Sequence, residues 1–331
     1  MKTIGTAMML GAIFAMGIGS QGCTLKTQDS SRFAEPIPQG SDVALGVPGS
    51  PSAVGTTAAS ATELHIDGYP NSGGAVGGDY AFWYAFTRNV TDGVDLGTAS
   101  ILGTISLVVQ LPATSTTADE AVWGPGGDAL DPAVWRLTVD EVATDEYDYH
   151  LDARPKASTS ESDYRALLTG HGYGDASPSH RSGWFQIDQD AYNALEPLRA
   201  HDSGTVKVTY DLRAFPKTIE ADVKHTADAA WFDFVVTHDA DGSGAVSANA
   251  NGDISTPPDG TYETITLESR YDSTGAGRAD VEVTGGDLGT QTVDSSECWG
   301  TTFAESYYTD DASWRPTSGD VAACVFPHAA F

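Results

Sequence analysis

The sequence is poor in basic residues. Its 331 residues include 17 Lys and Arg against 46 Asp and Glu, which gives a formal net charge of −29 at pH 7. The Lys and Arg residues are scattered singly along the chain, so no basic stripe interrupts the negative field. Because a polyanion is repelled by such a field, the composition excludes nucleic acid as a default partner.

The motifs of common active sites are also missing. The chain contains no H-E-x-x-H, no G-x-S-x-G elbow, no Walker loop and no G-x-G-x-x-G between a strand and a helix. His171 and His180 flank a glycine-rich loop with Asp175 between them, where we expect exposed loop histidines rather than a metal site. With 46 acidic residues, neighbouring carboxylates occur by chance, so the sequence identifies no catalytic residue.

Long hydrophobic runs are absent after the N-terminus, and the run at the N-terminus is short. Lys2 is followed by an apolar stretch over residues 4–18 and by a small-residue zone that ends at Gly22. This succession predicts an export signal over residues 1–22. The apolar stretch is too short and too rich in glycine to span a bilayer in the mature protein, and we expect no transmembrane segment elsewhere.

The residues around the expected cleavage point carry a resemblance. Ser20-Gln21-Gly22-Cys23 resembles the lipobox of bacterial lipoproteins, in which the cysteine becomes the lipidated N-terminus. The resemblance implies a membrane anchor on Cys23. Because Thr24 stands where an inner-membrane retention signal would have Asp, it also implies the outer membrane, facing the periplasm or the cell surface. The alternative is ordinary signal cleavage that leaves Cys23 as a free thiol.

Only three cysteines are present, and two of them lie near the C-terminus. An oxidising compartment favours pairing, and lipid on Cys23 would leave Cys298 and Cys324 to form a disulfide. For two residues 26 positions apart, the loop-entropy model gives a stabilisation on the order of 3 kcal/mol. The alternative, a redox-active or nucleophilic cysteine, has no C-x-x-C pattern to support it.

Composition divides the exported chain into two parts. Residues 23–60 are rich in Ser, Thr, Gly, Pro and Ala and nearly free of aromatic residues, which predicts a flexible tether. Aromatic and β-branched residues become frequent from Thr62 onward, so we expect one folded domain over residues 61–331.

The first element of that domain is expected to be helical. Over residues 80–111, apolar side chains recur at steps of three and four, as on one face of a helix. Glycines in this stretch weaken a helix, so we expect a break near residues 92–97. The alternative is a pair of strands joined by a turn at residues 91–93.

The rest of the domain is expected to be a β-meander. Val206, Val208 and Tyr210 alternate strictly with Lys207 and Thr209, which is typical of a strand with one dry face. We expect a helical turn at residues 190–199. We expect about twelve strands, at residues 134–139, 147–153, 164–172, 183–189, 204–212, 217–224, 229–238, 245–248, 262–271, 279–284, 297–307 and 321–326.

These elements predict a mostly β fold of the α+β class, a large curved antiparallel meander sheet covered by the N-terminal helical region. Over about residues 80–326 this architecture resembles the half-barrel of periplasmic lipoprotein carriers. The resemblance implies an apolar small molecule between sheet and helix. The side chains that would line such a site are Phe82, Phe86, Val90, Leu102, Ile105 and Val109.

Several short motifs carry a second resemblance. RALLTG at residues 165–170, DSTGAGRADV at residues 272–281, TGGD at residues 284–287 and SECW at residues 296–299 are similar to sequences in a group of uncharacterised Gram-negative lipoproteins. The resemblance implies a cell-envelope location and a single fold unit, and it implies no reaction.

One segment has a pattern of calcium ligands. Asp239, Asp241 and Ser243 followed by Gly244 match the first half of an EF-hand loop, but Ala250 occupies the position of the closing glutamate. Weak calcium binding is therefore one interpretation. A plain hairpin turn is the other, because Asp-Gly and Ser-Gly are common between two strands. We expect no other cofactor.

Taken together, the sequence predicts a non-enzymatic lipoprotein of the cell envelope that acts as a binding or structural module. Its partners would be the membrane, through the lipid, and possible apolar small molecules. Two alternatives remain open at this point: a secreted hydrolase that uses acidic residues, and a calcium-dependent surface adhesin.

Overall fold

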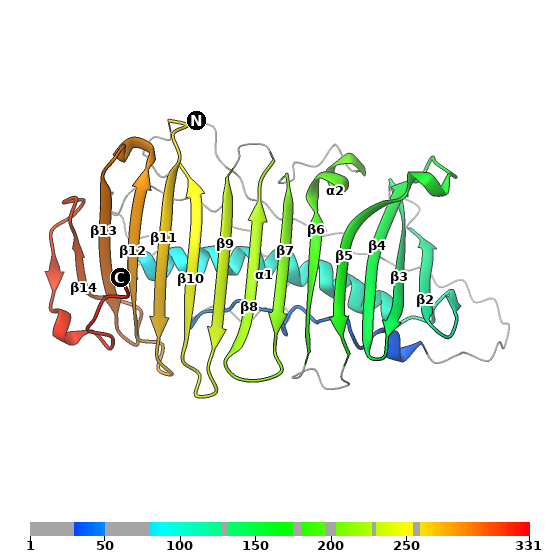
Figure 1. Cartoon of the computed structure of the whole chain (residues 1–331), viewed down its shortest axis with the longest axis horizontal. Helices are drawn as coiled ribbons and strands as arrows, with labels where there is room; N and C mark the ends of the chain where they lie inside the picture. Colours follow the sequence, from blue (N-terminus) through cyan, green and yellow to red (C-terminus); the bar gives the residue numbers. More distant parts are fainter. Residues whose placement is uncertain are drawn as a thin grey trace.

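The computed structural model describes residues 30–49, 80–127, 132–174, 181–195, 203–226, 230–253 and 259–331. The strands of these segments form one antiparallel sheet in which every strand pairs with its sequence neighbours (Figure 1). The predicted fold class, a mostly β protein with a large curved meander and a helical region near the N-terminus, is confirmed.

The sheet contains 15 strands in sequence order. They are β1 (Ser115–Thr116), β2 (Glu120–Gly126), β3 (Ala133–Ala143), β4 (Glu146–Pro155), β5 (Arg165–Tyr173), β6 (Ser182–Asp188), β7 (Thr205–Asp211), β8 (Lys217–Lys224), β9 (Trp231–His238), β10 (Gly244–Gly252), β11 (Glu263–Tyr271), β12 (Gly277–Gly285), β13 (Thr292–Trp299), β14 (Glu305–Asp310) and β15 (Ser318–Gly319). Short connections such as the turn after Asp239 join neighbouring strands, as expected for a meander.

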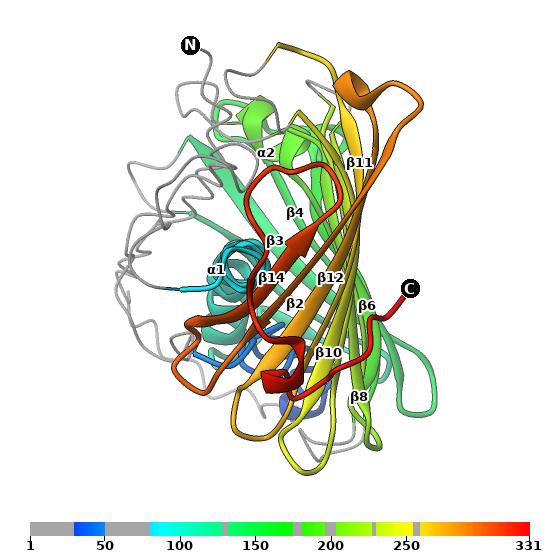
Figure 2. The same cartoon turned by 90° about the vertical axis from the view of Figure 1, so that its left-hand side faces the viewer.

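Helix α1 (Phe82–Val109) crosses the strands on one face of the sheet, which we call the inner face. Figure 2 shows the sheet curving around this helix. The backbone amide of Phe82 binds Glu297 of β13, and the carbonyl of Leu111, just after the helix, accepts a hydrogen bond from Trp123 of β2. The two ends of α1 are thus fixed to strands near opposite edges of the sheet.

The expected break in this helix is wrong. Helix α1 is continuous over 28 residues, or about 42 Å at 1.5 Å per residue. Gly93 is only partly exposed, and Gly103 is exposed with open space around its Cα. The burial of one helix face against a wide sheet outweighs a cost of about 1 kcal/mol for each glycine. The alternative of two strands at this place is wrong as well.

The inner face of the sheet is lined mostly by apolar side chains. In β7, the buried side chains Val206, Val208 and Tyr210 alternate with partly exposed ones. The same alternation recurs in β11, where Ile265 and Leu267 are buried. These side chains join those of α1 in a single core cluster, so one continuous core holds the helix on the sheet.

Residues 30–49 correct the expected tether. Phe33, Ile37, Val43, Leu45 and Val47 in this stretch are each at least nine-tenths buried and belong to the core cluster. The stretch runs beside α1 in the opposite direction (Figure 1). Spaced single apolar side chains in a segment rich in Ser, Pro and Gly fill the edge of the inner face. This part of the tether therefore belongs to the folded domain.

Several contacts fix residues 30–49 in this position. The carbonyl oxygen of Pro48 accepts a hydrogen bond of 2.6 Å from the hydroxyl of Tyr84 near the start of α1. A Cβ at Gly40 would lie only 2.7 Å from the Cα of Ala99, so glycine is needed for this close approach. At the other side, the guanidinium of Arg181 donates to the carbonyl oxygen of Ile37 at 3.1 Å.

Some strand predictions also need correction. Strands β1 and β2 were not predicted, because Gly124-Pro125 in β2 has the composition of a turn. The predicted strand at residues 297–307 is two strands, β13 and β14, separated by a tight turn after Gly300. The predicted strand at residues 321–326 is wrong, since a 3-10 helix, η5 (Val321–Ala323), stands there. The helical turn expected after Gln189 is helix α2 (Gln189–Leu195).

Candidate functional site

The side chains expected to line an apolar ligand site pack into the core. Val90, Leu102 and Ile105 are at most 3% exposed and belong to the core cluster. The other three side chains pack against that cluster and are partly buried; these are Phe82, Phe86 and Val109. The inner face is thus occupied by the protein's own side chains at these positions. Binding of an apolar molecule stays a prediction.

A buried carboxylate holds the beginning of α1. Glu297 of β13 is fully buried, and its two oxygens accept hydrogen bonds of 2.8 and 2.5 Å from the backbone amides of Phe82 and Trp83. The residue before the helix, Ala81, has no side chain that could cap these amides. Glu297 therefore caps α1 from the sheet, and its charge is favoured by the positive end of the helix dipole.

The surroundings of Glu297 set its ionisation. Burial raises the pKa of its carboxyl to about 8, although the two amide hydrogen bonds and the charge of Arg315 lower it. Arg315 lies 3.3 Å from the Glu297 carboxylate and also pairs with Glu305. A carboxyl with such partners serves to join the helix to β13, and all of its close partners belong to this chain.

A second buried carboxylate holds residues 30–49 against α1. Asp95, near the middle of the helix, accepts a hydrogen bond of 2.6 Å from the backbone amide of Leu45. Burial raises the pKa of the Asp95 carboxyl to about 7. Asp95 lies 13 residues after Phe82, which corresponds to about 20 Å along a helix. The carboxyls of Asp95 and Glu297 therefore do not converge on one site.

The segment with the calcium pattern forms the turn between β9 and β10. The backbone amide of Ser243 donates to the carboxylate of Asp241 at 2.9 Å, and the Ser243 hydroxyl donates to the carboxylates of both Asp241 and Asp239. These hydrogen bonds lower the pKa of Asp241. Within the described residues, no group of three or more His, Cys, Asp and Glu side chains is placed to hold a metal ion. Weak calcium binding stays a prediction, to be tested with a chelator.

The predicted disulfide between Cys298 and Cys324 is present, with a Cα–Cα distance of 5.7 Å. It joins β13 to the C-terminal segment over residues 321–331, which we call the strap. Glu297 points to α1, so its neighbour Cys298 points to the opposite face, as does Arg278, the ladder partner of Cys298. The strap thus lies on the outer face of the sheet, opposite the core (Figure 2).

Beneath the strap is a buried ion pair. The guanidinium of Arg278 donates to the carboxylate of Asp280 at 2.8 Å, and the two side chains are 4% and 2% exposed. Ser296 donates to Asp280 at 2.6 Å and accepts from Arg278 at 3.0 Å. The opposite charges and the shared hydroxyl satisfy one another, as a buried ion pair requires.

The connection between β4 and β5 covers the outer face near the other edge. It contains a 3-10 helix, η2 (Glu161–Asp163), followed by Tyr164. Arg136 of β3 pairs with Glu161 at 2.9 Å, and its guanidinium lies 4.2 Å from the centre of the Tyr164 ring. Arg154 of β4 lies 5.1 Å from the same ring. The outer face is therefore covered near both edges by segments of the chain itself.

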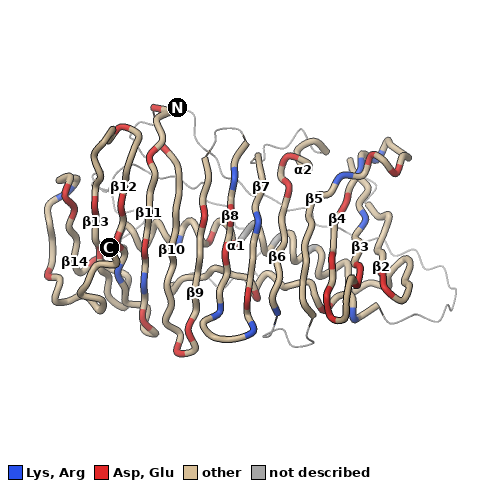
Figure 3. The backbone as a smooth tube through the Cα atoms, viewed as in Figure 1, with Lys and Arg blue, Asp and Glu red and all other residues tan. Residues whose placement is uncertain are grey.

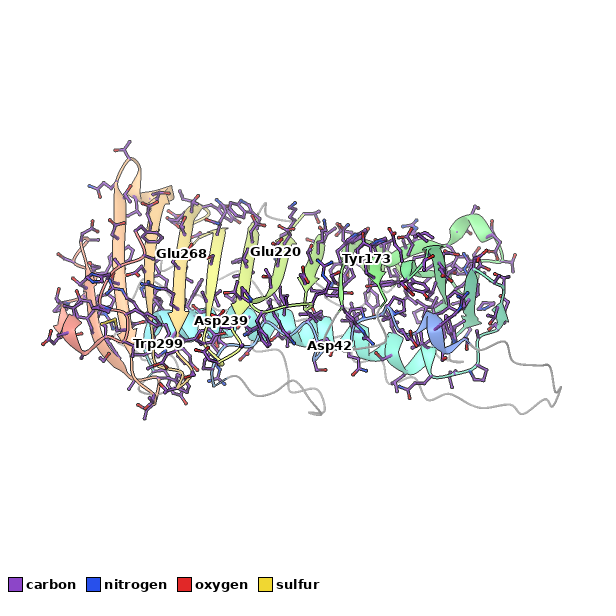
Figure 4. All side chains as sticks on the ribbon, turned by 60° about the horizontal axis from the view of Figure 1, so that its bottom comes forward. Asp42, Tyr173, Glu220, Asp239, Glu268 and Trp299 are labelled. Atoms are coloured by element: carbon purple, nitrogen blue, oxygen red, sulfur yellow. A yellow bond between two sulfur atoms is a disulfide. The ribbon has the colours of Figure 1, made fainter. Side chains whose placement is uncertain are left out.

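Between these covers, β6 to β10 present their outward side chains, which we call the outer field. Across it runs a row of residues paired in register: Trp184, Thr209, Glu220, Val235 and Ser247. Glu220 is exposed and Val235 is 38% exposed. Figure 4 labels Glu220 together with Glu268, which continues the row on β11 and accepts a hydrogen bond from Ser247 at 2.6 Å.

Aromatic and charged groups are combined in this field and beside it. The ammonium group of Lys207 lies 5.4 Å from the centre of the Trp184 ring. On the neighbouring strand, the ring nitrogens of His171 lie 2.7 Å from Asp148 and 3.4 Å from Glu146. Figure 3 shows acidic residues along the strands with Lys and Arg as single residues between them. The outer field thus presents both hydrogen-bond donors and hydrogen-bond acceptors over several neighbouring strands.

Two neighbouring carboxyls lie in the centre of the field. Asp222 of β8 and Asp233 of β9 are directly opposite each other in the ladder. Burial, and then the hydrogen bond and charge of Asp222, raise the pKa of Asp233. Two ionised carboxylates at directly opposed positions would destabilise the sheet, and the raised pKa of Asp233 reflects its burial and then this repulsion.

Comparison with known proteins finds no matching family model, no similar curated protein and no similar solved structure. Among the helices of the described segments, none combines the length and the hydropathy needed to cross a membrane. Cys23, Asp175 and His180, together with residues 1–22, lie outside the described residues. The lipid anchor and the export signal therefore stay predictions.

The buried charged residues Glu297, Arg278 and Asp280 were not identified from the sequence. Glu297 stands in phase with the buried positions Val293 and Ser295, so it is an acidic residue on the dry side of a strand. That phase is the signal that could have identified it. Arg278 and Asp280 alternate with apolar residues, as in a strand whose polar face is exposed to solvent. Nothing in the sequence indicates that the strap buries them.

Proposed function

We propose that the protein is a non-enzymatic lipoprotein of the cell envelope that binds a partner through the outer field of its sheet. The observation that carries the proposal is that other parts of the chain cover the inner face of the sheet but leave the outer field exposed. The inner face is filled by α1 and by residues 30–49, whereas Glu220, Lys224, Val235 and Asn249 of the outer field are exposed.

The proposed anchor is lipid on Cys23, in the sequence Ser20-Gln21-Gly22-Cys23 that resembles a lipobox. Two or three acyl chains, at about 0.8 kcal/mol for each buried methylene, hold a protein firmly at a membrane. The negative charge of the chain disfavours contact with anionic lipid surfaces. An anchored domain of this kind presents its surface to the surrounding compartment.

We propose no enzymatic reaction, because the buried carboxyls bind groups of the protein's own backbone. A site with acidic residues needs carboxyls with altered pKa values that converge on a substrate. Glu297 and Asp95 have raised pKa values, but each accepts hydrogen bonds from backbone amides of its own chain. They stabilise the fold and are not directed at a common position.

The chemistry of the outer field favours a particular kind of partner. Exposed carboxylates, hydroxyls and amides alternate with a tryptophan and a valine, as in the polar surfaces of non-obligate interfaces. Because the whole chain carries an excess of negative charge, partners with an uncharged or basic surface are favoured over anionic ones.

Two experiments test this proposal separately. The anchor is tested by separating membrane and soluble fractions of host cells that carry either the natural chain or Cys23→Ala. The natural chain should be found with membranes and should have the mass of a lipidated protein, whereas Cys23→Ala should be soluble. A natural chain that is soluble and unmodified would contradict the anchor.

The outer field is tested with the full Cys23→Ala chain immobilised and exposed to solubilised envelope material of the host. Glu220→Lys with Asp222→Lys, in the centre of the field, should abolish specific capture. The matched control is Asp259→Lys with Asp272→Lys, which reverses the same number of charges in two loops. Equal capture by both variants would contradict the proposal.

Native mass spectrometry tests the carrier hypothesis that the sequence raised. If the inner face is occupied by the protein's own side chains, the protein purified from its host has the mass of the chain with its lipid anchor and nothing more. A co-purifying apolar molecule that is lost when Leu102 or Ile105 is replaced by Trp would establish a carrier and contradict our proposal.

A further inference from the structure

The strap is held on the outer face through its main chain. The guanidinium of Arg278 donates to the carbonyl oxygens of Phe326 and Pro327 at 3.3 and 3.2 Å. Arg270 donates to the carbonyl oxygen of His328 at 2.8 Å, and Asp280 accepts from the amide of Ala330 at 2.9 Å. All four hydrogen bonds are made to main-chain atoms of residues 326–330.

The groups that make these contacts are built into the sheet. Arg278 and Asp280 lie on β12 and are nearly fully buried, and each also binds Ser296 of β13. Arg270 lies on β11, 3.4 Å from Asp280. The arginines keep donors free for main-chain carbonyls while Asp280 balances their charge, and such charge-assisted hydrogen bonds are stronger than neutral ones.

The strap itself is bound by few of its side chains. Cys324 is buried in the disulfide, and the ring of Phe326 lies 5.2 Å from the guanidinium carbon of Arg270. Val325 is 45% exposed and Phe331 is 60% exposed, and the residues from Pro327 to Phe331 are exposed throughout. The noncovalent attachment therefore rests on the backbone contacts and on one aromatic ring.

We propose that the outer face of β11 to β13 is a binding site for an extended peptide, which the protein's own strap occupies in this structure. The ligand class is a peptide segment with an aromatic residue followed by two residues whose carbonyl oxygens face the sheet. Proline is accepted after the aromatic residue, since only its carbonyl oxygen is used.

The disulfide explains why the strap occupies the site first. A ligand that is covalently tethered beside its site has an effective concentration in the millimolar range or higher, so a free peptide competes poorly with it. Without the Cys298–Cys324 link, the strap is held by the contacts above and by its main-chain connection to Asp320. The strap is then tethered at one end only, so it can leave the site more often and a competing peptide can bind in its place.

The test uses a fluorescent synthetic peptide with the sequence of residues 321–331 and Ser in place of Cys324. It is titrated by anisotropy into the chain ended after Asp320 with Cys298→Ser. We expect saturable binding, and binding at least about tenfold weaker to the disulfide-linked natural chain, whose site is filled. Adding Arg270→Gln to the shortened chain should weaken binding by a similar factor, whereas Arg213→Gln should have no effect.

If the shortened chain does not fold, the full chain with Cys298→Ser and Cys324→Ser replaces it. This chain keeps the strap, and it should bind the peptide more tightly than the natural chain does. Absence of binding to either folded variant would overturn the proposal. Equal binding to the natural chain, or binding that Arg270→Gln leaves unchanged, would place the peptide elsewhere and overturn it as well.

Discussion

The two faces of the sheet are made by the same strands but meet different surroundings. In β12, Ala279, Val281 and Val283 enter the core, whereas Arg278 and Asp280 point to the opposite side. On the inner face, α1 and residues 30–49 cover the sheet and contribute side chains to the core cluster. On the outer face, the described segments cover only the regions near the edges, and the outer field between them presents exposed side chains.

The acidic side chains differ in their contacts on the inner face and in the outer field. The inner carboxylates of Glu297 and Asp95 each bind backbone amides and join one piece of the chain to another. In the outer field, Glu220 is exposed, and Asp222 and Asp233 lie directly opposite each other on β8 and β9. The inner face thus joins the parts of the fold, and the outer field is the surface that we propose for binding.

The largest effect is expected from an apolar residue of the segment beside α1. Phe33 is fully buried, and its ring contacts that of Tyr147 with 6.2 Å between the centroids. Phe33→Ala should lower the free energy of unfolding by about 4 kcal/mol, because it removes a large buried side chain. Urea denaturation measures this, with Phe215→Ala, at a 55% exposed position, as the control. Equal effects of the two substitutions would contradict the packing of residues 30–49.

A slightly smaller effect is expected from the cap of α1. Glu297→Ala should cost about 3 kcal/mol, because it leaves the amides of Phe82 and Trp83 without acceptors and Arg315 without one partner. Glu297→Gln keeps one acceptor and should cost less. Glu220→Ala on the outer field should change stability by less than about 0.5 kcal/mol. If Glu297→Ala had as little effect as Glu220→Ala in thermal denaturation, the two faces would not differ as described.

The disulfide should contribute less than the inner contacts. Replacing both Cys298 and Cys324 by Ser should lower the free energy of unfolding by about 2 to 3 kcal/mol, since it releases a closed loop while the strap buries few other side chains. Denaturation with and without a reducing agent measures this contribution. The natural chain should lose stability on reduction and the double variant should not. A loss in both would show that the reductant acts elsewhere.

The last prediction concerns the dependence of stability on pH. The pKa of Glu297 is raised from 4.5 to about 8 and that of Asp95 from 3.8 to about 7, so the folded protein holds these protons more tightly than the unfolded chain. This contribution to stability is complete below the ordinary carboxyl range and is lost as pH rises through about 7 to 8. The melting temperature should therefore be lower at pH 9 than at pH 6.

The Glu297→Gln variant is the control for this pH dependence. Because Gln does not titrate, the variant should lose part of the difference in melting temperature between pH 6 and pH 9. Substitution of Asp211, whose side chain is about half exposed and whose pKa is lowered by its hydrogen bond with Arg213, should leave the difference unchanged. A natural chain with the same melting temperature at both pH values would contradict the assignment.

Local sequence patterns were sufficient for the sheet but not for what covers it. Strict alternation identified β7, and the bounds of β8 agree with the prediction. The continuity of α1 could not be predicted, because helix propensity at its glycines is overruled by contacts with the sheet. Residues 30–49 have the composition of a linker, and only the folded structure shows that their few apolar side chains meet the inner face.

Among the site residues, too, local or compositional patterns were predictable and long-range contacts were not. Cys298 and Cys324 could be paired from the number and positions of the cysteines, and the structure confirms the pair. The buried role of Glu297 depends on its phase within β13 and on the position of α1, which are long-range properties. The burial of Asp280 depends on where the C-terminal residues lie.

Hydrogen exchange of the natural chain, followed by mass spectrometry, tests the central claim most directly, namely that the protein closes its own inner face. We predict that the backbone amides of α1, and the hydrogen-bonded amides of residues 30–49 such as those of Phe33 and Leu45, are protected from exchange, because their opening requires disruption of the core. Exchange of both segments at the rate of unstructured peptides would contradict the account, since the inner face would then be open to a ligand.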